Sequence, residues 1–198
     1  EIHLETSYAY DIEIINRLYE RRKINKDIHI ICNGFKQKGY TSRIARLLNT
    51  GFKNVIPVLD NKEELDAYRR SVKVPFKLGI RVAAEEEPTF PFYTSRLGMR
   101  ARDILEFYVD KIEGNEHKFQ LKMLHIFLNK GIKDDIYYWS ELNKIIHLYC
   151  QLKKICPELD SINIGGGFPI KHSLGFEYDY QFMINEIVRN IKSACKKA

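Results

Sequence analysis

Three consecutive glycines, Gly165 to Gly167, are the residues of this chain whose type and spacing point most directly to chemistry. They follow an apolar run at residues 159–164 that is typical of a strand. Glycine costs conformational entropy, so a triplet is kept mainly where the backbone takes a positive φ or comes close to another group. At the carboxyl end of a strand, bare amides in a tight turn can cradle a phosphate. Two interpretations stay open at this point, an anion-binding turn and a plain flexible turn.

A few charged or titratable side chains lie in or just after other apolar runs. For Arg81, at the end of such a run, a role in a site and an ion pair with residues 85–87 are both open. His125 has apolar neighbours, which predicts a core histidine bonded to the backbone. Lys36 and Lys130 could form a Schiff base, but we predict ordinary lysines, because a reactive lysine needs a desolvated pocket that lowers its pKa.

Short apolar runs alternate with segments of helical periodicity along the whole chain. The predicted strands are Ile2–Thr6, Ile28–Cys32, Val55–Leu59, Phe76–Ala83, Leu121–Leu128 and Ser161–Ile164. The predicted helices are Asp11–Arg22, Thr41–Leu48, Asn61–Arg70, Arg102–Ile112, Tyr138–Ile155 and Tyr180–Ala194. Thr41 and Ser42 are expected to cap the second helix, and Asn61 with Glu64 forms a capping-box pattern at the third. Pro157 is expected to end the long fifth helix.

Strand–helix alternation predicts an α/β fold with a parallel sheet. A doubly wound dinucleotide-binding sheet would need a G-x-G-x-x-G turn after an early strand, which the sequence lacks. A (β/α)₈ barrel binds phosphate at loops after late strands, which suits the position of Gly165 to Gly167. A full barrel takes about 250 residues. The 198 residues therefore predict one domain, residues 1–198, that is an incomplete (β/α)₈ TIM-type barrel of about six β-α units.

Composition restricts the classes of partner. The chain is 44% hydrophobic and 29% charged, which is typical of a soluble globular protein. No apolar run is long enough for a bilayer and no signal pattern opens the chain, so we expect no membrane partner and a cytoplasmic location. The net charge of +6 is spread among acidic residues, which argues against nucleic-acid binding. The four cysteines lack CxxC spacing, so reduced, buried thiols and no zinc site are expected.

Seven short blocks occur in the order seen in pyridoxal-phosphate decarboxylases of the alanine-racemase-like barrel type, and the chain resembles that family. The blocks are Leu4–Ser7, Ile31–Lys36, Val55–Val58, Leu78–Arg81, Ser95–Met99, Leu124–His125 and Ile164–Gly167. Within the family, the run from Cys32 to Lys36 is most similar to the biosynthetic arginine decarboxylases. The resemblance implies pyridoxal phosphate across the barrel mouth, with its phosphate on Gly165, Gly166 and Gly167.

The resemblance also assigns single residues to the cofactor. Glu5 and Asp11 match acidic residues near the cofactor lysine, and Arg81 matches an arginine close to the cofactor ring. Phe127 replaces a ring-stacking histidine, so it can still stack but cannot donate a hydrogen bond. Lys130 replaces a phosphate-contacting serine and would bring a point charge.

The chain departs from the family pattern in what it lacks. No residue matches the Schiff-base lysine. The C-terminal β-domain and the strand whose carboxylate pairs with the pyridine nitrogen are not found either. The expected function is part of a pyridoxal-phosphate-dependent amino-acid decarboxylase, with arginine as the first guess, a homo-oligomeric parent protein, and inactivity of these residues alone. Two alternatives are a non-catalytic pyridoxal-phosphate-binding barrel and a phosphosugar-type barrel enzyme.

Overall fold

The computed structural model describes residues 3–84, 97–128, 135–166, 168–171 and 175–197. The strands are β1 (Leu4–Thr6), β2 (His29–Cys32), β3 (Asn54–Leu59), β4 (Phe76–Val82), β5 (Phe119–Ile126) and β6 (Ser161–Asn163). The helices are α1 (Ala9–Glu20), α2 (Lys38–Asn49), α3 (Glu64–Ser71), α4 (Ala101–Phe107), α5 (Asp135–Ile155) and α6 (Tyr180–Lys197), with a π-helical turn η1 (Tyr108–Ile112) that continues α4. None of the helices in these ranges is both long and apolar enough to cross a membrane.

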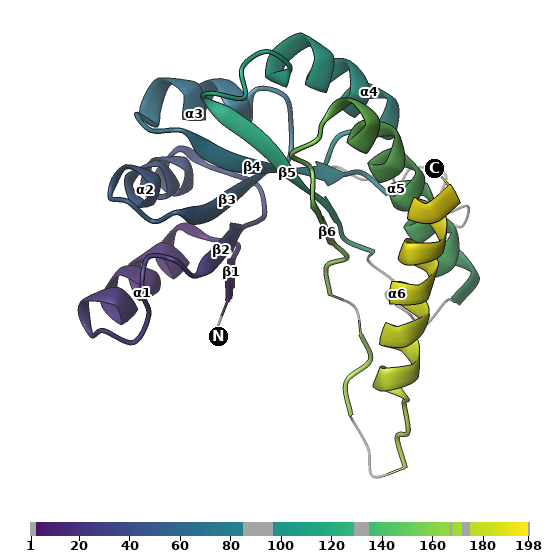
Figure 1. Cartoon of the computed structure of the whole chain (residues 1–198). Coiled ribbons are helices and arrows are strands. Elements are labelled where there is room, and N and C mark those ends of the chain that lie inside the picture. The colour runs from purple at the N-terminus through teal and green to yellow at the C-terminus, as the bar shows by residue number, and fades with distance from the viewer. Residues whose placement is uncertain (1–2, 85–96, 129–134, 167, 172–174, 198) are drawn as a thin grey trace.

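The strands form one sheet in the order β1-β2-β3-β4-β5-β6, and each neighbouring pair is parallel. Figure 1 shows that this sheet curls into an arch with the helices on its outer, convex side. The strands β1 and β6 are the two edges of the described sheet. The predicted incomplete barrel of six β-α units is therefore confirmed.

The sheet is packed on both faces because side chains alternate along each strand. On the convex face, strand residues such as Ile30, Val55 and Ile80 belong to the large core shared with the helices. On the concave face, Ile31, Ile56, Val58 and Met123 form a separate buried cluster. Further along the strands, the same concave face carries polar side chains, which form the candidate site.

Two helix starts differ from the sequence prediction. Helix α2 begins at Lys38 after Gln37, so Thr41 lies inside the helix, where its hydroxyl donates to the Gln37 carbonyl at 3.4 Å. For α3, Asn61 Oδ1 accepts from the Glu64 amide at 3.0 Å, as half of the expected capping box requires. The Glu64 carboxylate is bonded elsewhere, because a buried lysine competes for it.

Candidate functional site

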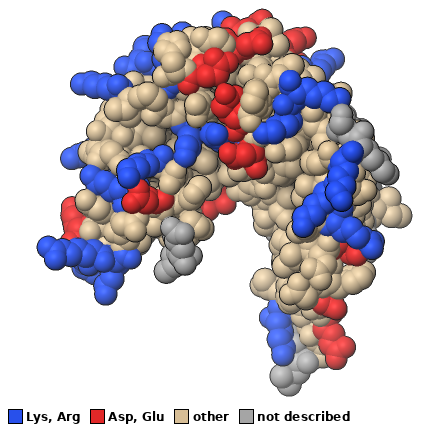
Figure 2. All heavy atoms as spheres, in the orientation of Figure 1, with Lys and Arg blue, Asp and Glu red and all other residues tan. Residues whose placement is uncertain are grey.

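Strand register brings three polar residues together at the carboxyl ends of the central and late strands. Arg81 on β4 lies opposite His125 on β5, and His125 lies opposite Asn163 on β6. Met123 lies on the concave face, and His125, two residues further along β5, faces the same way. Arg81 and Asn163 lie opposite His125 on the neighbouring strands, so all three side chains lie on the inner side of the arch. Figure 2 shows the hollow on this side, with basic and acidic side chains intermixed on the face in view.

His125 is buried, with 1% of its surface exposed. Its Nε2 lies 2.8 Å from the Asn33 side-chain nitrogen, so the bond goes to a side chain and the expected backbone partner was wrong. Since the Asn33 amide nitrogen can only donate, Nε2 accepts and the ring proton is assigned to Nδ1. Burial, with smaller contributions from Arg81 and Lys36, lowers the pKa of His125 to about 3. The imidazole is therefore neutral at physiological pH.

Glu5 joins the two edges of the sheet. Its carboxylate accepts from Asn33 Nδ2 at 3.1 Å and from Asn163 Nδ2 at 3.2 Å. Asn163 in turn accepts from the Gly165 amide through Oδ1 at 2.8 Å. We call Glu5, Asn33, Asn163 and Gly165 the edge network. It places the predicted acidic residue Glu5 beside the predicted glycine turn.

The glycines of the turn have different roles. Gly165 has φ +68°, and a Cβ there would lie 2.5 Å from the Ile126 carbonyl oxygen, so the fold itself requires glycine. Gly166 is exposed, and a Cβ built on it meets no atom within 4 Å. Gly167 lies outside the described residues. Gly165 is explained by backbone packing, and its amide is already bonded to Asn163. Gly166 is therefore the described residue of the triplet best placed to meet a ligand.

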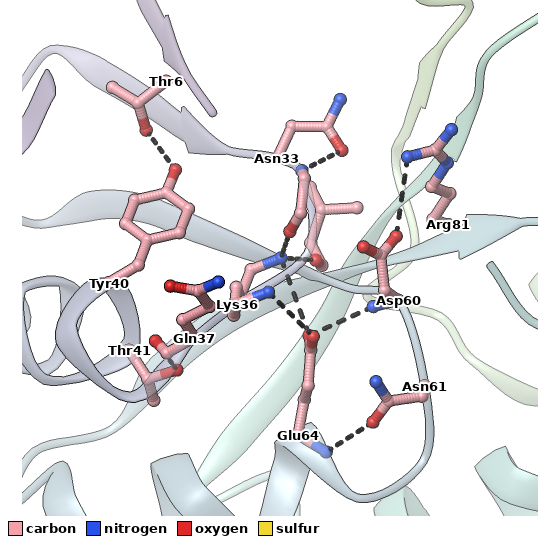
Figure 3. Close-up of polar contacts among 12 residues, drawn as sticks. Thr6, Asn33, Lys36, Gln37, Tyr40, Thr41, Asp60, Asn61, Glu64 and Arg81 are labelled. Atoms are coloured by element: carbon pink, nitrogen blue, oxygen red, sulfur yellow. Dashed lines mark hydrogen bonds and ion pairs between the residues drawn. The ribbon is translucent and has the colours of Figure 1, made fainter. Parts of the chain in front are cut away.

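Lys36 is buried in the loop that follows β2, shown in Figure 3. Its Nζ donates to the carbonyls of Gly34, at 2.7 Å, and Val58, and lies 3.6 Å from Glu64 Oε2. The side chain has 0% exposure, and burial lowers its pKa although Glu64 and Asp60 oppose the effect. Lys36 is thus desolvated, but two carbonyls and a carboxylate hold its amine, which fits the predicted ordinary lysine.

Glu64 links this lysine to the next strand end. Its carboxylate accepts from the Lys36 amide at 3.3 Å and from the Asp60 amide at 3.1 Å. Asp60 then lies 3.6 Å from Arg81 Nη1. Burial raises the pKa of both carboxyl groups, opposed mainly by the nearby Lys36 charge. We call Lys36, Asp60, Glu64 and Arg81 the buried charge cluster.

The buried charge cluster sets the position of Arg81. Its partner is Asp60, and residues 85–87, the alternative partners in the sequence, lie outside the described ranges. The Arg81 guanidinium carbon lies 5.7 Å from the centre of the Phe127 ring, within range of a cation–π contact. Phe127 is 43% exposed, so the strand ends present an accessible aromatic ring next to a fixed positive charge.

The remaining predicted site residues are not gathered with these. The Asp11 carboxylate accepts from the amides of Ser7 and Tyr8, each at 2.9 Å, and so caps α1. Lys130 lies outside the described residues. Sequence reasoning gave Glu64 a role only in helix capping and gave no role to Asp60 or Asn163. Each lies at a strand end or opens the following helix, which was the available signal.

The gathered residues suit a flat anionic cofactor. An aromatic side chain such as Phe127 can contact a planar ring, while Arg81 and the open backbone at Gly166 suit a negatively charged group. The neutral His125 has a buried Nδ1 that makes no hydrogen bond to the part of the chain described. On these observations the residues present fit pyridoxal phosphate.

Comparisons with known proteins give the same assignment. The family model described as "Pyridoxal-dependent decarboxylase, pyridoxal binding domain" matches residues 20–198. The biosynthetic arginine decarboxylase of Prochlorococcus marinus (strain AS9601) is 25% identical over 187 residues, covering 87% of this chain and 28% of that protein. The enzyme of that name from Vibrio cholerae is 22% identical over 181 residues, covering 84% of this chain and 28% of that protein. The chain thus spans 28% of the length of these curated relatives.

Solved structures share the fold. The biosynthetic arginine decarboxylase of Campylobacter jejuni superposes with a TM-score of 0.70 at 22% identity, over 98% of this chain and 32% of that one. Lysine decarboxylase of Selenomonas ruminantium superposes with a TM-score of 0.72 at 15% identity, over 97% of this chain and 47% of that one. Diaminopimelate decarboxylase of Helicobacter pylori superposes with a TM-score of 0.68 at 14% identity, over 98% of this chain and 47% of that one.

The family match covers most of the chain, and the half-barrel carries a strand-end layer that fits the cofactor named in the match. The chain therefore belongs to the pyridoxal-dependent decarboxylases and falls in their pyridoxal-binding domain.

Proposed function

We propose that this chain supplies part of the cofactor-binding barrel of an amino-acid decarboxylase, with arginine as the first candidate substrate. The observation that carries the proposal is the single layer of strand-end residues on the concave face. In that layer the Asp60–Arg81 ion pair, the exposed Phe127 ring and the glycine turn lie at adjacent strands. Barrel enzymes place their chemistry at this end of the strands.

Each residue then has a physical task. Phe127 packs against one face of the cofactor ring, while Arg81, held by Asp60, keeps a positive charge beside it. Gly166 offers its backbone amide without a side chain in the way. Glu5 keeps Asn33 and Asn163 in place. When bound, pyridoxal phosphate supplies the electron sink that stabilises the carbanion formed on loss of CO₂.

Arginine is preferred among substrates because of the relatives. The curated proteins from Prochlorococcus marinus and Vibrio cholerae are named biosynthetic arginine decarboxylases. The similar folds also include enzymes named for lysine and diaminopimelate. Arginine decarboxylation would give agmatine and CO₂, a route into polyamines.

The cofactor site is tested by titrating the purified full-length protein with pyridoxal phosphate. Gly166→Val should weaken binding about tenfold, the effect of losing about one charge-assisted hydrogen bond, while its melting curve stays unchanged. Gly39→Val on α2 is the matched control, because Gly39 also has nothing within 4 Å of its Cβ position. Equal dissociation constants for wild type and Gly166→Val would make the triplet a plain turn.

Activity is tested separately, by release of labelled CO₂ from arginine, lysine, ornithine or diaminopimelate. We expect release from arginine by the full-length protein and none from residues 1–198 alone, since these lack a counterpart of the cofactor lysine. Cofactor binding without release from any substrate would support the non-catalytic barrel instead. Binding of sugar phosphates but not of pyridoxal phosphate would support the phosphosugar alternative.

We also expect the protein to associate with itself. The edge strands β1 and β6 offer backbone for pairing, and α6 exposes the apolar side chains Tyr180, Ile184 and Val188 at helical spacing. Light scattering of residues 1–198 should give a mass above 23.4 kDa. A stable monomer with a cooperative melt would contradict this.

A further inference from the structure

Cys150 and Cys195 lie side by side, although 45 residues separate them in the sequence. Their sulfur atoms are 3.9 Å apart, one on α5 and the other on α6. Both are free thiols, but Cys150 is half-buried and Cys195 is exposed, so the expectation of buried cysteines was wrong for this pair. The other two cysteines, Cys32 and Cys156, are buried at 0% and 1% exposure.

We propose that Cys150 and Cys195 form a reversible disulfide site that ties α6 to α5. A disulfide needs its sulfur atoms about 2.0 Å apart, so closing the 3.9 Å gap takes side-chain rotation and a small shift of the helices. The pair does not form a zinc site, because no cluster of three or more potential ligands occurs among the residues that the structure describes.

The two thiols differ in reactivity. Cys195 is the exposed one and meets a dissolved oxidant first. Burial raises the pKa of Cys150, and the neighbouring Cys195 adds to the effect while Lys154 opposes it. The exposed Cys195 is therefore the attacking cysteine, and Cys150 beside it acts as the resolving cysteine.

The oxidant that we infer is a small-molecule disulfide, such as oxidised glutathione. The Cys195 thiolate attacks one of its sulfurs, forming a mixed disulfide and releasing one thiol. Cys150 then loses its proton and attacks Cys195 Sγ, which releases the second thiol. Two protein thiols are oxidised, and one disulfide is reduced to two thiols, so atoms and electrons balance.

The bond would act on the segment that carries the glycine turn. Residues 151–194 lie between the two cysteines and include β6, Gly165 and Gly166. A cross-link at both ends of a segment of this length reduces the freedom of the unfolded chain and stabilises the folded one. Oxidation would therefore stabilise the folded chain, with the disulfide itself between α5 and α6.

The test uses the full-length protein treated with oxidised glutathione, blocked with N-ethylmaleimide and digested with trypsin without reduction. Trypsin places Cys150 in residues 145–153 and Cys195 in 193–196, apart from Cys32 in 27–36 and Cys156 in 155–171. Mass spectrometry should find the first two peptides joined, two hydrogen masses below their sum. It should also find them separate after dithiothreitol.

Variants and melting curves complete the test. Oxidised wild type should melt roughly 5–10 °C above reduced wild type, and Cys195→Ser should abolish the difference. Cys156→Ser, with its cysteine on the same stretch of chain but buried, should keep the difference. Glutathione left on Cys195 without cross-link, a disulfide between two copies of the chain, or equal melting temperatures would each overturn the proposal.

Discussion

The buried charge cluster and the edge network occupy the same end of the sheet but are held by opposite means. In the buried charge cluster, Lys36 and Asp60 have side chains with 0% and 2% exposure and are ion-paired with Glu64 and Arg81. In the edge network, Glu5 makes its bonds to Asn33 and Asn163 in exposed positions. Desolvation makes a buried charge costly unless it is paired, while water replaces an exposed hydrogen bond cheaply. The first region therefore holds Arg81 in a fixed position, and the hydrogen bonds of the second contribute less to stability.

The largest difference should come from Glu64→Leu. It leaves the buried Lys36 ammonium without its carboxylate partner and should cost about 3 kcal/mol of unfolding free energy. Urea denaturation of the purified protein measures the loss. The double variant Lys36→Met, Glu64→Leu should regain at least half of it, because no buried charge remains. Arg189→Ala, which breaks the exposed pair with Glu186, should stay within about 0.5 kcal/mol of wild type. If Glu64→Leu lost as little unfolding free energy as Arg189→Ala, the buried charge cluster would be no more important for stability than an exposed ion pair.

The glycine turn gives a second contrast, between Gly165 of the edge network and Gly166 next to it. Gly165→Ala should cost about 2 kcal/mol, because its φ of +68° is unfavourable for alanine and its Cβ would meet the Ile126 carbonyl at 2.5 Å. Gly166→Ala should change the unfolding free energy by less than about 0.5 kcal/mol, since its Cβ position is open. Thermal denaturation of the two variants measures both. Equal losses would mean that the whole triplet serves the fold.

His125 connects the two regions and should make stability depend on pH. Its pKa falls from 6.5 to about 3 on folding, so between these values the unfolded state binds more protons and stability drops as the pH falls. From pH 6 to pH 4 the loss should be about 1 kcal/mol per pH unit. His125→Asn should remove this part of the slope, while Asp60 and Glu64 titrate in both proteins. Parallel stability profiles for wild type and His125→Asn would show that the imidazole does not resist protonation.

The smallest effect should follow Glu5→Gln. The side chain keeps its length and an acceptor oxygen but loses the charge in an exposed network, so the cost should be about 0.5 kcal/mol. Denaturation beside wild type in the same buffer checks it. A loss near that of Glu64→Leu would show that the edge network supports the fold as strongly as the buried charge cluster does.

Part of this architecture is accessible to sequence reasoning because it depends on local pattern. Alternation and helical periodicity predict the strands and helices to within a few residues, and Pro157 follows the end of α5 as expected. Arg81 was found because it lies at the end of an apolar run, whereas Phe127 was found only through the family resemblance. The start of α2 was missed. The helix begins at Lys38 after Gln37, and the hydroxyl of Thr41 donates to the Gln37 carbonyl within the helix instead of capping its start.

The sequence by itself determined the parallel sheet, because strand–helix alternation predicts it, and the lack of a G-x-G-x-x-G turn, the late glycine triplet and the chain length favoured a half-barrel over a doubly wound sheet. It also indicated which residues end strands. Only the tertiary structure decided which of them meet: Asp60 beside Arg81, Glu64 between two strand ends, and Cys150 against Cys195. The physical reason is that ion pairs, pKa shifts and thiol contacts depend on distance and burial in space, which strand register and helix packing set and which no spacing along the chain encodes.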